Sequence, residues 1–154
     1  MNKIKIRRLT AQDIGAAAAI EARCLQEAWS ECAYRSAFRM DGENSWFWGA
    51  EREGELVGVI GLFRMGKDGE IGNVAVVPEH RRQGIASKLL ETALEAGERK
   101  LAMLSFTLEV RDGNLPALKL YESHGFRTEG MRPHFYQNPT EDARIMWRRG
   151  DNGI

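Results

Sequence analysis

The sequence predicts a mixed α/β domain, with a mostly antiparallel sheet and flanking helices. Two observations support this fold class. Antiparallel strand-like runs come first, and a strand, a basic loop, a helix and a further strand follow them. With 154 residues and 43% apolar content, the chain is long enough to form a single domain, 1–154, around one core. It contains no internal repeat, low-complexity segment or interdomain linker.

The N-terminal part predicts one strand followed by two helices. Apolar residues alternate roughly over Lys3–Leu9, which is typical of a strand. Thr10 is a suitable N-cap for an alanine-rich helix over Ala11–Leu25. After a break, Ser30 is a second candidate N-cap, and the helix that it opens is expected over Glu31–Met40.

The next part predicts three consecutive antiparallel strands. The strand-like runs are Trp46–Arg52, Glu55–Met65 and Glu70–Val77. A polar turn over Asp41–Ser45 precedes them. Glu53-Gly54 joins the first two as a hairpin, and Gly66–Gly69 forms the turn into the third.

A basic, glycine-containing loop then leads into a helix over Gly84–Arg99. Pro78 ends the preceding strand, because proline has no N–H to donate to a central ladder. The first turn of the helix offers unpaired backbone N–H groups, and Arg81 and Arg82 add cationic donors. These features favour a phosphate-binding loop over an ordinary connection with surface arginines. The G-x-G-x-x-G of a Rossmann loop and the G-K-[ST] of a Walker loop are both absent.

The next predicted elements, a strand over Met103–Val110 and a helix over Asn114–His124, carry two further candidate functional residues. Glu109 lies between two apolar strand residues, where an acid faces solvent or has a function. Tyr121 on the helix is either a core aromatic or a functional hydroxyl. Two strand-like runs, Gly125–Arg132 and Glu141–Arg149, close the fold.

The run R-R-Q-G-I-A resembles the pyrophosphate loop of the GNAT acetyltransferases. The resemblance implies that acetyl-CoA is bound by the loop residues Arg81, Arg82, Gln83, Gly84, Ile85 and Ala86. It also implies that the strands 70–77 and 103–110 splay apart and admit the pantetheine arm. The backbone of Val74, Ala75 and Val76 would then contact acetyl-CoA, with the Val76 N–H stabilising the oxyanion.

The pattern L-E-V-R-x-x-N-x-x-A-x-x-L-Y-x-x-x-G-F is similar to the signature of the ribosomal-protein alanine N-acetyltransferases, the RimI type. This resemblance implies that Glu109 is the general base and Tyr121 the general acid of direct acetyl transfer. It also implies that Asn114 contacts CoA, a role compatible with an N-cap.

Two further patches resemble elements that shape the peptide groove in the same enzymes. E-A-R followed by A-W-S contains Trp29, which is either a groove residue or a core aromatic. G-M-R-P-H-F-Y-Q-N-P-T-E-D-A-R-I-M contains Arg132 and Tyr136, which we expect to contact the peptide. Together the resemblances cover Lys3 to Trp147.

The amino-acid composition indicates which binding partners and which cellular location to expect for this protein. The formal net charge is zero, so bulk attraction to nucleic acid or membrane is not implied. The N-terminus lacks the apolar core of a signal peptide, and Cys24 and Cys32 form no disulfide framework, so a cytoplasmic location is expected. The histidines His80, His124 and His134 lack metal-ligand spacing, so no metal is expected.

We therefore expect N-α-acetylation of the N-terminal alanine of a small-subunit ribosomal protein by a monomer or weak dimer. One alternative is a small-amine or antibiotic acetyltransferase on the same scaffold, because fold alone does not separate the two. A second is a non-catalytic acyl-CoA-binding module, which the presence of both Glu109 and Tyr121 disfavours.

Overall fold

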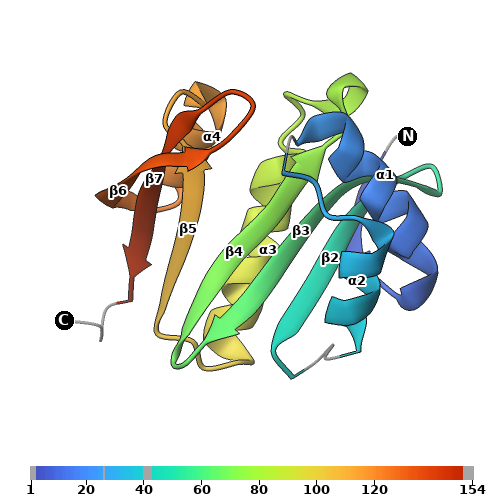
Figure 1. Ribbon diagram of the computed structural model, residues 1–154. Coiled ribbons are helices and arrows are strands. Elements are labelled where there is room, and N and C mark those ends of the chain that lie inside the picture. Colours follow the sequence, from blue (N-terminus) through green and yellow to red (C-terminus); the bar gives the residue numbers. More distant parts are fainter. Residues whose placement is uncertain (1–2, 26, 40–42, 151–154) are drawn as a thin grey trace.

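The computed structural model describes residues 3–25, 27–39 and 43–150 (Figure 1). Within these ranges one seven-stranded sheet has the order β1-β2-β3-β4-β5-β7-β6. The strands are β1 (Ile4–Arg8), β2 (Ser45–Arg52), β3 (Glu55–Met65), β4 (Asp68–Val76), β5 (Ser105–Arg111), β6 (Arg127–Tyr136) and β7 (Glu141–Arg149). The helices are α1 (Ile14–Cys24), α2 (Glu31–Phe38), α3 (Ile85–Arg99) and α4 (Leu115–Ser123), with 3-10 turns at Ala11–Asp13 and Pro78–His80.

Strands β1 to β4 are antiparallel, and the predicted hairpin is confirmed. Glu53 and Gly54 join β2 to β3 with positive φ angles of 53° and 82°, a left-handed conformation that glycine adopts without steric cost. The turn predicted over Gly66–Gly69 is too long, since Asp68 already pairs with Met65 in the ladder. The local sequence does not reveal this pairing, because the ladder with β3 overrides the low strand propensity of aspartate and glycine.

The first predicted helix differs at its start. Residues Ala11–Asp13 form a 3-10 turn, and the α-helix begins only at Ile14. The Asp13 carboxylate accepts the Thr10 backbone N–H at 2.7 Å, so Thr10 and Asp13 cap the segment as expected. Helix α2 starts after Ser30, whose Oγ accepts the Ala33 N–H at 3.1 Å. Met40, the predicted end of this helix, lies outside the described residues, as do positions 41 and 42 of the predicted turn.

The C-terminal elements follow the predicted order with shifted ends. Strand β5 begins at Ser105 rather than Met103, because the Met103 N–H bonds the Gly97 carbonyl at the end of α3. The strand expected over Gly125–Arg132 begins at Arg127 and continues to Tyr136, where it still pairs with β7. Strand β7 has the predicted bounds.

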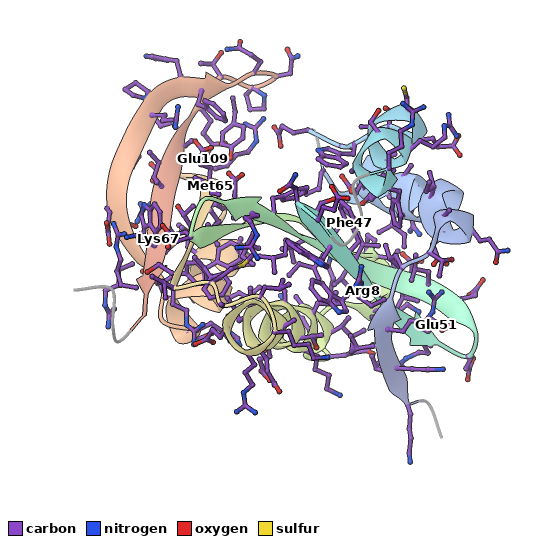
Figure 2. All side chains as sticks on the ribbon, turned by 90° about the horizontal axis from the view of Figure 1, so that it is seen from below. Arg8, Phe47, Glu51, Met65, Lys67 and Glu109 are labelled. Atoms are coloured by element: carbon purple, nitrogen blue, oxygen red, sulfur yellow. The ribbon has the colours of Figure 1, made fainter. Side chains whose placement is uncertain are left out.

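Helices cover both faces of the sheet. Helices α1 and α2 lie on one face and α3 on the other (Figures 1 and 2). Figure 2 shows Phe47 and Glu109 on the same side as α1 and α2. Helix α3 approaches β5 closely at Gly97, where a Cβ atom would lie 2.6 Å from the Phe106 ring. Within the described ranges, no helix has the length and apolar character that a membrane crossing requires.

The junction between β4 and β5 positions the site. These two strands are parallel, and they pair only at Gly69 with Phe106 and Glu70 with Thr107. Beyond these pairs the strands diverge (Figure 1). Strand β4 has a bulge nearby. Gly72 and Ala75, three residues apart, pair with Gly61 and Val59 of β3, which are two residues apart. The predicted splay between the two strands is therefore confirmed.

Candidate active site

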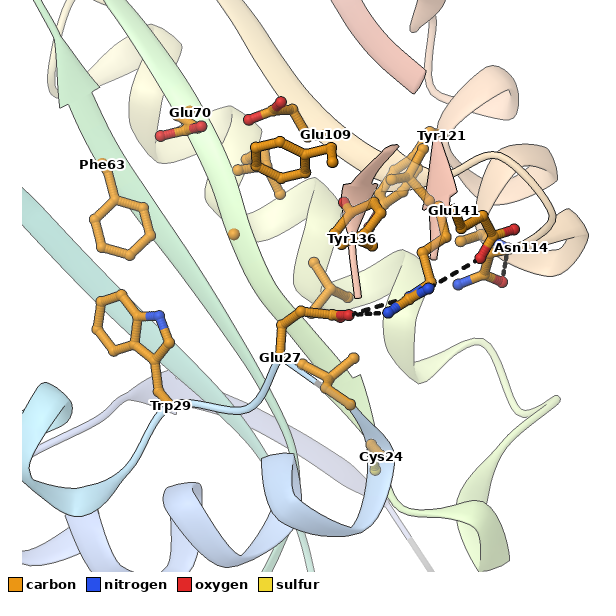
Figure 3. A pocket seen from close by; sticks show the side chains of 18 of the residues that line it. Cys24, Glu27, Trp29, Phe63, Glu70, Glu109, Asn114, Tyr121, Tyr136 and Glu141 are labelled. Carbon is orange, nitrogen blue, oxygen red and sulfur yellow. Dashed lines mark hydrogen bonds and ion pairs between the residues drawn. The ribbon is translucent and has the colours of Figure 1, made fainter. Parts of the chain in front are cut away.

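A pocket of about 660 Å³ opens where β4 and β5 separate (Figure 3). Four parts of the chain line it: β3 and β4, β5 with α4, the segment between α1 and α2, and the region around the β6–β7 turn. The chemically relevant lining residues are Cys24, Glu27, Trp29, Phe63, Glu70, Val74, Glu109, Arg111, Asn114, Tyr121, Tyr136 and Glu141. Strands that stop pairing expose backbone donors and acceptors, so this pocket offers an extended ligand both main-chain and side-chain partners.

Glu109 faces the pocket because of the alternation of β5. Its neighbours Leu108 and Val110 are buried, whereas the Glu109 side chain keeps 24% of its surface exposed. The Arg132 Nε atom lies 2.7 Å from Glu109 Oε2, close enough for an ion pair but without hydrogen-bond alignment. A partly solvent-accessible carboxylate with a cationic neighbour is suited to exchanging a proton with a bound amine.

Tyr121 reaches the pocket from α4. The Asn114 Oδ1 atom caps this helix by accepting the Ala117 N–H at 3.3 Å, as the sequence predicts. Tyr121 is 8% exposed, and its ring packs edge-on against Phe126. Burial, with a smaller contribution from Tyr136, raises the pKa of Tyr121 above its usual value. The phenol therefore stays protonated at neutral pH and is available as a proton donor.

Glu70 is a second carboxylate in the pocket, and the sequence analysis missed it. It is half-buried in β4 and pairs in the ladder with Thr107, two residues before Glu109. Burial and repulsion from Glu109 raise the pKa of Glu70, while Arg132 acts in the opposite direction. A signal was present, because Glu70 is the only charged residue in the predicted strand Glu70–Val77.

Trp29 both packs in the core and lines the pocket. Its ring meets Tyr34 edge-on at 5.4 Å and lies 5.5 Å from Phe63, between ring centroids. Its backbone N–H donates to the Glu21 carboxylate at 2.9 Å. Glu21 is fully buried and also accepts the Tyr34 hydroxyl. The two readings of Trp29 that the sequence left open are thus compatible.

Arg111 links two segments that border the pocket. Its Nε atom donates to Glu27 at 3.1 Å, and its Nη1 donates to Glu141 at 3.1 Å (Figure 3). Its guanidinium carbon lies 4.6 Å from the centroid of the Tyr136 ring. Arg111 therefore connects the segment after α1 to the β6–β7 turn, a role that residue spacing did not reveal.

The basic loop lies outside the pocket lining, at the end of β4. Gly84 precedes α3 with φ of 78°, and Arg82 has φ of 62°. Arg82 and Gln83 are exposed, while Ile85 is buried and anchors the helix. Arg81 is exposed, and its Nε donates to the Val76 carbonyl at 2.9 Å. The loop thus presents its backbone and basic side chains to solvent beside the N-terminus of a fifteen-residue helix.

The residues predicted for acetyl-CoA and substrate are distributed over this region. Val74, Glu109, Asn114, Tyr121, Trp29 and Tyr136 line the pocket, and Arg132 contacts it through Glu109. Ala75 and Val76 have buried side chains, and Ala86 is half-buried in the first turn of α3. In the described part of the chain, no three His, Cys, Asp or Glu side chains converge as a metal site would require.

Comparison with known proteins places the chain in a family. The profile of the acetyltransferase (GNAT) family matches residues 15–126. A Bacillus subtilis protein described as a putative [ribosomal protein bS18]-alanine N-acetyltransferase is 31% identical over 94% of this chain and 95% of its own length. The [ribosomal protein bS18]-alanine N-acetyltransferase of Escherichia coli K12 is 32% identical over 90% of each chain.

The structural comparison agrees. The crystal structure of the ribosomal-protein-S18-alanine N-acetyltransferase from Escherichia coli superimposes with a TM-score of 0.86 at 31% identity. The alignment covers 97% of this chain and 98% of that one. Acetyl-CoA is the acetyl donor of GNAT acetyltransferases, and the splayed strands and exposed basic loop suit such a ligand. The chain belongs to the acetyltransferase (GNAT) family and is an N-acetyltransferase of the RimI type.

Proposed function

We propose that this protein acetylates the N-terminal alanine of a small-subunit ribosomal protein, with acetyl-CoA as donor. The observation that carries the proposal is the position of Glu109 and Tyr121 on the lining of one pocket, where β4 and β5 separate. The printed activities of the Bacillus subtilis and Escherichia coli relatives support the choice of acceptor.

The acetyl donor is assigned to the split between the strands. The pantetheine arm would pair with the unpaired backbone near Val74–Val76, and the pyrophosphate would lie on the loop from Arg81 to Ala86. Asn114 lines the same pocket and is assigned to contact CoA as well as to cap α4.

The acceptor peptide is assigned to the opposite side, between the segment after α1 and the β6–β7 turn. Trp29 and Tyr136 line this side, and Arg132 extends from β6 to Glu109. Arg111 fixes the two segments to one another, so the peptide would meet a preformed groove.

The chemistry requires no nucleophile on the enzyme. Glu109 removes a proton from the ammonium group, and the free amine then attacks the thioester carbonyl, forming the C–N bond. The Val76 N–H stabilises the oxyanion. When the C–S bond breaks, Tyr121 protonates the departing thiolate, and the second amine proton leaves to solvent. The product is an uncharged amide.

Release of CoA with two matched peptides tests the proposal. One peptide copies the alanine-initiated N-terminus of the ribosomal protein, and the other carries a blocked N-terminus but keeps an internal lysine. We expect turnover with the free alanine alone. Turnover with small amines but with neither peptide would favour the small-amine alternative, and acetyl-CoA binding without turnover of any amine would favour the binding module.

Three further expectations stay predictions. They are the cytoplasmic location, the absence of nucleic-acid and membrane partners, and the monomeric or weakly dimeric state.

A further inference from the structure

Glu70 is a carboxylate at the site for which the mechanism above has no use. It projects from β4 into the pocket at the same end as Glu109 on β5 (Figure 3). The ladder pair of Glu70 with Thr107 places Glu109 two residues further along β5, so both acids lie on one face of the sheet. Each is partly shielded from water.

The charges around this pair are unbalanced. Arg132 approaches Glu109 to 2.7 Å, and no described residue forms an ion pair with Glu70. Two carboxylates and one guanidinium leave the cluster one positive charge short when both acids are ionised. The repulsion appears in the raised pKa of Glu70, for which burial is the larger cause and Glu109 the second.

A half-buried acid that forms no ion pair is unfavourable for the free protein, since Arg132, whose ion pair is with Glu109, offsets the desolvation of Glu70 only in part. The wall beside it includes Phe63, which offers no hydrogen-bond donor. The missing partner is therefore a cation with several N–H donors that enters through the pocket. The ammonium form of a primary amine meets this requirement.

We propose that Glu70 binds the ammonium group of the acceptor, while Glu109 takes the proton from it. This inference rests on the proposed function, because it assigns the two carboxylates separate tasks in the same acetyl transfer. Glu70 holds the charged acceptor beside Glu109 before deprotonation. Once the nitrogen is acylated, the amide carries no charge, so the product loses its attraction to Glu70 and leaves more readily.

The test compares the binding of the charged substrate with that of its neutral product. Wild type, Glu70→Gln and the surface control Glu95→Gln are saturated with CoA and titrated with the alanine-initiated peptide and with its N-acetylated form. We expect Glu70→Gln to weaken binding of the free amine about tenfold or more and to leave binding of the acetylated peptide within about twofold, since only the free amine loses a charge-assisted hydrogen bond. Glu95→Gln should match wild type for both peptides.

Kinetics supply the second readout. In Glu70→Gln the KM for the peptide should rise about tenfold, with kcat within about threefold and the KM for acetyl-CoA unchanged. Equal weakening of both peptides would overturn the proposal, because it would indicate a structural role. A loss of kcat at unchanged KM would also overturn it, because Glu70 would then act as the base.

If the proposed peptide acceptor is wrong, the experiments distinguish this from a wrong role for Glu70. If wild type acetylates a small primary amine but not the peptide, the peptide assignment falls, and the same variants are compared with that amine and its acetamide. The expected selective loss of affinity for the charged form is unchanged. An equal loss for amine and acetamide would overturn the role of Glu70 independently of the acceptor.

Discussion

At the residue scale, the proposed chemistry depends on two carboxylates, of which one has an ion-pair partner and the other has none among the described residues. Glu109 has a cation 2.7 Å away, whereas Glu70 has no ion-pair partner among the described residues. Both belong to strands whose neighbouring side chains pack in the core, so their backbone positions are fixed. The difference between them is set by Arg132, which reaches back from β6.

Replacing Glu109 by glutamine tests its role as the base. We expect Glu109→Gln to lower kcat by about 10²-fold or more at neutral pH, the usual scale for loss of a general base. The rise of the rate with pH should also be lost, because the amide does not titrate. The exposed acid Glu129 on β6, paired with Arg149 on β7, gives the control Glu129→Gln, which should retain full activity. Unchanged turnover of Glu109→Gln across the pH range would remove Glu109 from this role.

Glu21 fixes the segment around Trp29, which borders the side of the pocket assigned to the acceptor peptide. Its fully buried carboxylate accepts both the Trp29 N–H and the Tyr34 hydroxyl. Glu21→Ala leaves both donors without this acceptor, and we expect it to lower the free energy of unfolding by about 2–4 kcal/mol. Tyr34→Phe removes one of the two bonds and should cost about 1–2 kcal/mol. Urea denaturation measures both values, and a smaller effect for Glu21→Ala than for Tyr34→Phe would contradict this account.

At the element scale, ion pairs between side chains add to apolar contacts in joining β1 to the 3-10 turn Ala11–Asp13 and to β2. Arg7 on β1 forms two bonds to Asp13, of 2.8 and 2.9 Å, and one to Glu51 on β2, of 2.9 Å. Hydrogen bonding from Arg7, assisted by the Thr10 N–H and opposed by burial, lowers the pKa of Asp13 to about 2.

This lowered pKa predicts a pH-dependent contribution to stability. Because the folded pKa lies below the ordinary value of about 3.9, the contribution is complete above about pH 4 and disappears as the pH falls toward 2. We expect Asp13→Asn to lower the free energy of unfolding by about 1 kcal/mol at pH 6, a value reduced for the partial exposure of the pair. The difference should shrink between pH 4 and pH 2.5 in denaturant titrations. The exposed Glu98, which pairs with the half-buried Arg148, gives the control Glu98→Gln, expected within about 0.5 kcal/mol of wild type.

At the scale of the whole molecule, the sheet consists of two parts with a weak seam. Strands β1–β4 form one part and β5–β7 the other, and only two ladder pairs join them across β4 and β5. Helix α3 strengthens the seam where Gly97 lets it approach Phe106. A ligand between the diverging strands would add contacts to both parts.

Acetyl-CoA should therefore stabilise the whole protein. At a hundredfold excess over its Kd, a ligand specific for the folded state adds about 2.7 kcal/mol. For a chain of this size we expect Tm to rise by roughly 5–10 °C in calorimetry. Gly84→Ala should reduce the rise, because alanine is strained at the positive φ of this position and the phosphate loop would distort. An unchanged Tm at saturating acetyl-CoA would contradict the assignment of the donor site.

Much of this organisation is determined by the sequence itself. Local signals at Ser30 and Asn114 fix the starts of α2 and α4, and Thr10 marks the 3-10 turn that precedes α1, because capping depends on a few adjacent residues. Strand periodicity places Glu109 on a face opposite to its apolar neighbours. The family-specific patterns around Glu109 and Tyr121 predict the roles that we propose for them, since both residues lie within a single short segment of the chain.

Tertiary structure alone decided which distant groups meet. Glu70 acquires its importance from the parallel pairing of β4 with β5, which brings it beside an acid 39 residues later in the chain. The contact of Arg132 with Glu109 and the bridge from Glu27 through Arg111 to Glu141 likewise join separate elements. Charge and burial at such positions depend on neighbours that periodicity does not encode, because periodicity reports the face of an element and not what packs against it.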